Sequence, residues 1–355
     1  MKIHCRRFIA PLALLLSLTT IASTFADGTA SCDAQQGMTF VCGPRNPEDL
    51  VALPDTPWVI VSGMSGEGFS GHLYLLDPGT GAYQDLFPGS APARQWDQAL
   101  YGSCPGLLDL DNFSAHGLAI RPLGDGLHQL YVTSHGAREA VELFTVDARG
   151  DTPGVTWVGC VPMPKYASIN SVAPLPDGGF ITTRIFGEGP EASGDVFAGE
   201  ISGYLYEWHP GGSVTALAGT DLSGPNGIET SRDGNTLFVA SWGSSGVHRY
   251  VRRADGSFLH NGVAPTKFRV DNVRWSDDGR LLAAGHRLSA AQDCGEQLCL
   301  DEWEVAEIDT QSLTARTLAV KKPVSGFTGA TVAVRAGGAL WLGTFHGDRL
   351  ARLPD

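Results

Sequence analysis

The chain has 355 residues, enough for one large domain or two ordinary ones, and its 45 glycines and 21 prolines favour turns over long helices. Charged residues make up 18% and hydrophobic residues 43%, which argues against a disordered chain, and the glycine content argues against a helical bundle. The formal net charge of −13 disfavours nucleic acid and anionic membrane surfaces as partners and suits cations. We therefore expect an all-β protein with many tight turns.

The N-terminal residues have the pattern of a targeting segment. A basic start is followed by the apolar run 8–21, which fits the central region of a signal peptide and is short for a membrane-spanning helix. Thr24 and Ala26 supply small residues before a cleavage site. We predict a signal peptide over residues 1–26, no membrane span after its cleavage, and export to a periplasm or beyond. The alternative is an uncleaved membrane anchor.

The remainder of the chain, residues 27–355, reads as a repeat. Each unit contains a short apolar strand, a turn built on Gly or Asp-Gly, and a second apolar strand. Successive units begin roughly 45 to 70 residues apart, which is the scale of a four-stranded propeller blade. These units predict a single six-bladed β-propeller domain with a central channel. In chain order the runs are 58–63 and 72–77; 116–120, 130–133 and 141–144; 169–172 and 177–181; 226–228 and 233–239; 271–273 and 278–282; 330–333 and 337–342.

Export changes the interpretation of the cysteines. Once Cys5 is removed with the signal peptide, six cysteines remain, and an even number in an oxidising compartment indicates disulfides. A zinc site is the alternative, but only one pair of cysteines has a zinc-like spacing. Loop closure favours partners that are near in sequence, which gives Cys32–Cys42, Cys294–Cys299 and Cys104–Cys160.

Polar residues recur where the innermost strand of a unit begins, which in a propeller faces the mouth of the channel. Glu48 and Asp271 supply carboxylates there, and Asn170, Asn226 and Asn272 supply amide oxygens. A set of oxygen ligands suits a hard divalent cation, calcium above magnesium or zinc. Two carboxylates also balance the charge of the ion while leaving it able to polarise a ligand.

Each of these residues has a simpler explanation when it is taken alone. Asn226 is followed by Gly227, a pair that is more often a turn than a ligand. Asn170 could cap a strand, and Glu48 could be a solvated loop residue. We interpret His286 as structural or as part of the channel wall. The prediction of a metal site therefore depends on the shared position in the repeat.

Several short motifs carry a family resemblance that covers most of the chain from Pro47 to His346. They are Glu48-Asp49-Leu50, Phe113-Ser114-Ala115-His116-Gly117-Leu118, the stretch from His135 to Phe144, Asn170, Asn226-Gly227-Ile228, Val270-Asp271-Asn272 and Gly343-Thr344-Phe345-His346. On these motifs the chain resembles the calcium-dependent paraoxonase/arylesterase family of six-bladed propellers. It resembles the regucalcin-like gluconolactonases more distantly, because they and strictosidine synthase-like propellers share Asn-Gly-Ile.

The resemblance implies a site for each residue that matches a family motif. A catalytic calcium would bind Glu48, Asn170, Asn226, Asp271 and Asn272, and the catalytic histidine dyad would be His116 and His135. A second, structural calcium would use Asp49 and the backbone carbonyl of Leu118, together with an aspartate whose position holds Ser171 here, so this second ion stays open. Vertebrate members also link their two ends by a disulfide. Residues 349–355 contain no cysteine, so the ring must close by strand pairing or another bridge.

These expectations combine into a predicted mechanism. Calcium would stabilise the oxyanion formed from a lactone or ester carbonyl. His116 would deprotonate the attacking water, since an unperturbed imidazole titrates near pH ~6.5. His135 would orient His116 or relay the proton, and the segment Gly187–Ser202 would form a lid over the channel. The alternative for the base is that calcium alone activates the water.

We therefore predict an exported, monomeric, calcium-dependent hydrolase that acts on small-molecule lactones or aryl esters. The sequence contains no Gly-x-Ser-x-Gly motif, which disfavours a serine hydrolase of that type. One alternative is a gluconolactonase-like enzyme that prefers sugar lactones. Another is a non-catalytic propeller in which calcium only holds the ring together.

Overall fold

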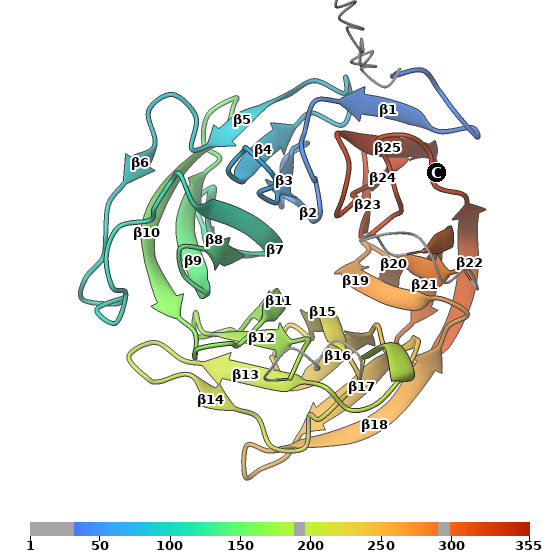
Figure 1. Cartoon of the computed structure of the whole chain (residues 1–355). Coiled ribbons are helices and arrows are strands. Elements are labelled where there is room, and N and C mark those ends of the chain that lie inside the picture. Colours follow the sequence, from blue (N-terminus) through green and yellow to red (C-terminus); the bar gives the residue numbers. More distant parts are fainter. Residues whose placement is uncertain (1–31, 188–195, 290–298) are drawn as a thin grey trace, which may run out of the picture. The chain divides into compact units, whose positions relative to one another are not determined.

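Six β-sheets are arranged radially around a central axis, which confirms the predicted six-bladed propeller (Figure 1). The structure is a computed structural model that describes residues 32–187, 196–289 and 299–355. The predicted signal peptide, Cys294 and residues 188–195 of the predicted lid lie outside these ranges. The described part contains one short helical segment, at residues 196–198, and no helix there is long and apolar enough to cross a membrane.

The strands of the first three blades follow one another from the channel outward. Blade 1 is β2 (Leu50–Ala52), β3 (Val59–Gly63), β4 (His72–Leu76) and β5 (Tyr83–Phe87). Blade 2 is β7 (Phe113–Gly124), β8 (Leu127–Gly136), β9 (Ala140–Asp147) and β10 (Gly154–Pro162), with β6 (Ala93–Arg94) added at the outer edge. Blade 3 is β11 (Ile169–Pro174), β12 (Phe180–Arg184), β13 (Tyr204–Trp208) and β14 (Thr215–Ala216).

The other three blades have the same order, except that the last one takes its outer strand from the N-terminus. Blade 4 is β15 (Pro225–Thr230), β16 (Thr236–Ser241), β17 (Gly246–Arg252) and β18 (Phe258–Pro265). Blade 5 is β19 (Arg269–Trp275), β20 (Leu281–Leu288), β21 (Leu300–Asp309) and β22 (Thr314–Lys321). Blade 6 is β23 (Ala333–Ala336), β24 (Ala339–Leu342), β25 (Arg349–Pro354) and β1 (Thr39–Cys42).

The hydrophobic core lies between neighbouring blades. The middle strands are apolar on both faces because each blade packs against two others, and every residue of β3 is buried. The outer strands face solvent, and five of the eight residues of β22 are exposed. Trp157, Trp303 and Trp341 are fully buried and fill the space between sheets in three different blades. This packing fixes the angle between blades and hence the geometry of the channel.

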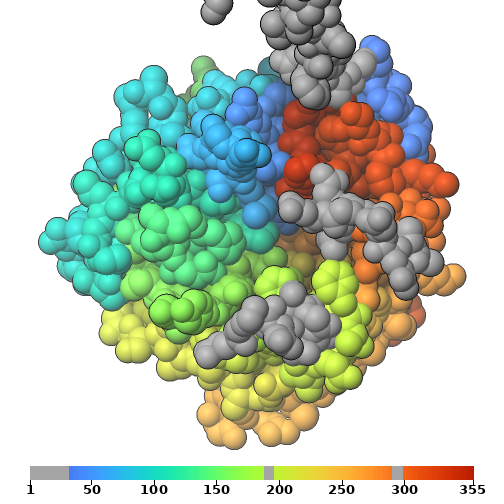
Figure 2. Space-filling model, viewed as in Figure 1, coloured from blue at the N-terminus to red at the C-terminus, as the bar shows by residue number. Residues whose placement is uncertain are grey.

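The ring closes by strand pairing, which is one of the two predicted alternatives. β1 pairs antiparallel with β25 from Thr39 opposite Arg352 to Cys42 opposite Arg349, so the chain's first and last strands share a blade (Figure 1). In the space-filling view, blue residues from the N-terminal end of the described chain lie against red residues from its C-terminal end (Figure 2). The predicted disulfide Cys32–Cys42 is present at the end of β1.

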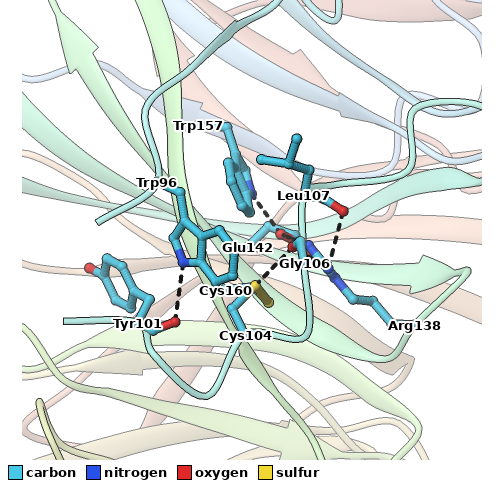
Figure 3. Close-up of a disulfide and its surroundings, with 9 residues drawn as sticks. All are labelled: Trp96, Tyr101, Cys104, Gly106, Leu107, Arg138, Glu142, Trp157 and Cys160. Atoms are coloured by element: carbon cyan, nitrogen blue, oxygen red, sulfur yellow. Dashed lines mark hydrogen bonds and ion pairs between the residues drawn. A yellow bond between two sulfur atoms is a disulfide. The ribbon is translucent and has the colours of Figure 1, made fainter. Parts of the chain in front are cut away.

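The second predicted disulfide, Cys104–Cys160, is also present and ties the loop before β7 to β10 (Figure 3). Beside it the fully buried Glu142 carboxylate accepts hydrogen bonds from the Arg138 guanidinium at 2.7 and 2.9 Å and from Trp157 Nε1 at 2.7 Å. A buried carboxylate is tolerated when it is paired and hydrogen-bonded in this way. The third predicted pair includes Cys294, which lies outside the described residues.

Candidate functional site

The same irregularity occurs in four inner strands at the same end of the channel. The pairing register shifts between Ala115 and Leu118, between Ile169 and Val172, between Pro225 and Ile228, and between Val270 and Val273. Such bulges bend a strand and redirect its side chains. The residues within them include most of the predicted site, namely His116, Asn170, Asn226, Asp271 and Asn272.

Contacts between blades hold these bulges in place. The Thr133 hydroxyl of blade 2 donates to the Asn170 carbonyl oxygen of blade 3 at 2.6 Å, and the Thr183 hydroxyl of blade 3 donates to the Asn226 carbonyl oxygen of blade 4 at 2.6 Å. Gly117 lies so close to the next blade that a Cβ atom there would be 2.4 Å from the Asn170 carbonyl oxygen. The two asparagines are therefore positioned through their backbones by neighbouring blades, which leaves their side chains free for another role.

The bulges surround the floor of a cavity of about 440 Å³ at the mouth of the channel. Its lining includes Glu48, His116, Asn170, Asn226 and Asp271, together with His135 and His286. Asn272, Asp49 and Leu118 are fully buried and do not line this cavity. The structure therefore brings six of the residues predicted for the catalytic site to one cavity, and the seventh, Asn272, contacts one of them, Glu48.

Two amide groups in this floor turn their NH₂ groups toward neighbouring side chains. Asn272 Nδ2 donates to Glu48 Oε1 at 2.7 Å, and Asn170 Nδ2 lies 3.5 Å from His116 Nε2. The atoms left buried without a hydrogen-bond partner are Asn170 Oδ1, Asn226 Oδ1, Asn272 Oδ1 and Glu48 Oε2.

Buried oxygen atoms without partners are costly, and a cation is a partner that satisfies several at once. The two carboxylates of the floor add to this cost. Burial, followed by the charge of Glu48, raises the pKa of Asp271 well above its usual range. Oxygen atoms and two acids are what a calcium ion requires, so the residues present fit the predicted ion. No cluster of three or more His, Cys, Asp or Glu side chains suited to a metal occurs in the described ranges, and three of the five predicted ligands are asparagines, which lie outside those residue types.

A relay of hydrogen bonds leads away from the floor. His116 Nδ1 lies 2.8 Å from His135 Nε2, and His135 Nδ1 lies 2.9 Å from Glu139 Oε2. The other Glu139 oxygen, Oε1, accepts a hydrogen bond from the Ile169 backbone N–H at 2.7 Å. Burial opposes protonation of His116, but the nearby acids Glu48, Asp49 and Glu139 together outweigh it, and the pKa of His116 is raised. The histidine dyad is therefore part of a longer His-His-Glu chain.

Two further residues clarify the surroundings of the floor. His286 Nδ1 lies 3.6 Å from Asp271 Oδ2, and its ring packs edge-on against Phe345 with the ring centroids 5.6 Å apart. Burial lowers the pKa of His286 to about 4, so this side chain is neutral at physiological pH. His286 is thus a wall residue of the cavity, which agrees with one of its two predicted roles.

The residues predicted for a second calcium ion are already satisfied by a cationic side chain. The buried Arg274 guanidinium bonds to Asp49 Oδ2 through Nη2, and the same Nη2 donates to the Leu118 carbonyl oxygen at 2.9 Å. Its Nε donates to the Leu50 carbonyl oxygen at 2.9 Å. Ser171 also offers no charge where an aspartate would be required. These residues therefore do not fit a second calcium ion.

Two features of the site were not assigned from the sequence. Glu139 lies in the stretch from His135 to Phe144, but its role depends on a tight turn that brings it back to His135. Arg274 follows Asn272 by two positions, and strand alternation places both on one face of β19. That alternation was the available signal for Arg274, although its partner Asp49 lies 225 residues away in the chain.

The sequence matches no protein-family model and no curated protein. Among solved structures, one provisionally described as a gluconolactonase has a TM-score of 0.55 and 16% sequence identity, over 90% of this chain and 96% of that chain. A luciferin-regenerating enzyme has a TM-score of 0.54 and 14% identity, over the same shares of the two chains. At this identity the likeness extends to the fold alone. It supports the resemblance to gluconolactonase-type propellers at that level, and the paraoxonase resemblance stays a prediction.

Proposed function

We propose that the protein is an exported, calcium-dependent hydrolase of lactones or aryl esters. The observation that carries this proposal is the group of four buried oxygen atoms without partners beside a histidine relay at the floor of one cavity. Its likeness in fold to a provisionally described gluconolactonase agrees with a lactone substrate. The two disulfides between described cysteines, Cys32–Cys42 and Cys104–Cys160, are typical of proteins in an oxidising compartment.

The five floor residues would hold the ion, and each has a definite task. Glu48 and Asp271 would provide the charge, and the amide oxygens of Asn170, Asn226 and Asn272, which have no hydrogen-bond partner, would be available as neutral ligands. When bound, calcium would supply the positive charge that polarises the substrate carbonyl and stabilises the oxyanion.

His116 is the candidate general base. Its Nε2 atom faces the floor, 3.6 Å from Glu48 Oε2, while Nδ1 is engaged by His135. A nitrogen that faces the reacting carbonyl and is backed by a second imidazole can take a proton from water and pass it on. His116 is a weaker candidate for a calcium ligand, because calcium prefers oxygen.

The walls of the cavity point to the type of substrate. Above the polar floor they are formed by Met64, Ile169, Ile185, Phe186, Phe197, Trp242 and Phe345. A sugar lactone carries several hydroxyl groups, and each would need a polar partner when it is buried. These walls offer few such partners. We therefore favour lactones with alkyl or aryl substituents, or aryl esters, over the sugar lactones of the gluconolactonase alternative.

A panel of alkyl-substituted lactones, aryl esters and gluconolactone, each assayed with and without a chelator, tests this proposal. We expect hydrolysis of the apolar substrates, loss of activity in chelator, and recovery with calcium that exceeds recovery with magnesium. Full activity after verified removal of the metal would contradict the calcium dependence. Tight calcium binding without turnover of any substrate would instead support the non-catalytic alternative.

A further inference from the structure

We propose that Glu139 is a positioning residue, which acts through His135 to hold His116 in the tautomer that leaves Nε2 free to accept a proton. Its consequence for catalysis rests on the proposed function, whereas the tautomer itself can be measured independently. The inference comes from the polarity of the hydrogen bonds along the relay, which runs from the turn between β8 and β9 to the cavity floor.

The direction of the hydrogen bonds, from donor to acceptor, follows from the carboxylate of Glu139 at the end of the relay. An ionised carboxylate can only accept hydrogen bonds, so His135 Nδ1 must donate to Glu139 Oε2 across 2.9 Å. A neutral His135 then has its lone pair on Nε2, which must accept from His116 Nδ1 across 2.8 Å. A neutral His116 therefore carries its own lone pair on Nε2.

At the cavity floor, the neighbours of His116 Nε2 are consistent with the same direction of hydrogen bonding. The Asn170 amide presents its NH₂ group to His116 Nε2 at 3.5 Å, which suits an acceptor nitrogen, and its Oδ1 is one of the atoms left without a partner. Glu48 Oε2 lies 3.6 Å from the same nitrogen and would favour a proton on it. The same oxygen is a candidate calcium ligand, and in the calcium-loaded protein it would bind the ion instead. The proposed tautomer is therefore best tested in the calcium-loaded protein.

Glu139 is held firmly enough to impose this order. Its second oxygen accepts from the Ile169 N–H at 2.7 Å, which fixes the carboxylate between blades 2 and 3. The preceding residue, Arg138, is anchored to Glu142 and also donates to the carbonyl oxygen of Gly106 at 2.9 Å, in the loop that the Cys104–Cys160 disulfide ties down (Figure 3). The turn that carries Glu139 therefore has little freedom to move.

The substitution Glu139→Gln can preserve one of the two hydrogen bonds of this side chain and reverse the direction of the other. A glutamine can keep its oxygen toward the Ile169 N–H, but it then presents an NH₂ group to His135. That group requires an acceptor, so His135 would carry its proton on Nε2 and donate to His116. His116 would in turn carry its proton on Nε2, where it cannot act as a base.

Nitrogen-15 spectra of the imidazoles, recorded on the calcium-loaded chain, report these tautomers without any substrate. We expect protons on Nδ1 of both histidines in the wild type and on Nε2 of both in Glu139→Gln. With an apolar lactone, kcat should fall about 10²-fold or more, because a wrong tautomer removes most of the contribution of a base. KM and calcium affinity should stay close to wild type.

Asp109→Asn is the matched control, because Asp109 is an exposed carboxylate that lines a separate hollow shared with His135 and makes no bond to the relay. It should leave the tautomers and kcat unchanged. Identical tautomers in the wild type and Glu139→Gln would overturn the proposal, as would an equal loss of kcat in the Asp109 control. If the wild type hydrolyses no lactone or ester, the proposed function fails, while the spectra still decide whether Glu139 sets the tautomer.

Discussion

Replacing Arg274 with methionine should destabilise the propeller strongly, and more so at high pH. Arg274 is 4% exposed, and its guanidinium bonds to Asp49, which is fully buried, and to the carbonyl oxygens of Leu50 and Leu118. Methionine keeps much of the apolar volume but leaves these groups without a cation. Removing one partner of a buried ion pair typically costs about 3–5 kcal/mol, so we expect a loss of this size in the free energy of unfolding at pH 8.

The pH dependence follows from the acids that face Arg274. Burial raises the pKa of Asp49 to about 6 and that of Glu229 to about 7, although Arg274 opposes both shifts. An acid with a raised pKa in the folded state binds protons more tightly there, so it favours folding at low pH and loses this contribution as pH rises through the raised value. Without Arg274 the penalty should therefore shrink by at least about 1 kcal/mol between pH 8 and pH 5.

Urea unfolding followed by tryptophan fluorescence at the two pH values measures both effects. Arg280→Met is the matched control, because Arg280 is half-exposed on the following turn and pairs with the exposed Asp278. Such surface pairs contribute at most about 1 kcal/mol. Arg280 also lies 3.9 Å from Glu307, but Glu307 keeps its ion pairs with Arg316 and Arg335 in this variant. If Arg274→Met lowers the free energy of unfolding no more than the Arg280 control does, Arg274 is not the group that neutralises Asp49. A loss that does not depend on pH would lead to the same conclusion.

Four other substitutions test the cavity floor and its walls. Asp271→Asn should weaken calcium binding yet stabilise the metal-free protein near neutral pH. The reason is that the pKa of Asp271 is raised in the folded protein, so its negative charge opposes folding at any pH above the pKa of the free side chain. Calorimetry with and without calcium measures both effects, and an unchanged calcium affinity would mean that the ion binds elsewhere. His116→Gln should lower turnover about 10²- to 10⁴-fold with calcium affinity and Tm preserved, and His135→Gln should act more weakly in the same direction; full lactonase turnover across the pH range would exclude the histidine base. Phe345→Ala should raise KM for an aryl-substituted lactone more than for an unsubstituted one, and equal effects on the two substrates would remove Phe345 from the binding wall.

The repeat was readable from the sequence because each blade is a local unit. A strand, a glycine-containing turn and a second strand leave the same pattern wherever they occur, and the polar residue at the head of the inner strand keeps its phase in that pattern. Asn170 and Asn226 could therefore be compared although they lie in different blades. The near disulfide Cys32–Cys42 and the pair Cys104–Cys160 were predictable for a similar reason, since loop closure limits the choice of partner.

The contacts that complete the site could not be read in this way because they join distant segments. Arg274 meets Asp49 across the first and fifth blades, and nothing local to either residue identifies the other. Glu139 is close to His135 in sequence, but the bond between them depends on a turn whose shape is set by Arg138 and the loop near Gly106. Sequence reasoning thus found the residues of the floor, and missed those that neutralise or orient them.

Glu48 and Asp49 are neighbouring buried acids, and their negative charges are balanced in different ways. Asp49 is neutralised permanently by Arg274, while Glu48 keeps one oxygen without a partner at the cavity floor. Only Glu48 would then depend on an exchangeable ion for its neutralisation. The ring is closed without that ion, by the pairing of β1 with β25. Removing calcium should therefore lower Tm, because a ligand that binds only the folded state stabilises it, but should leave the propeller folded. Far-ultraviolet circular dichroism and a cooperative melt in excess chelator measure this. Unfolding on chelation at 25 °C would mean that the ion holds the ring together, as the non-catalytic alternative requires.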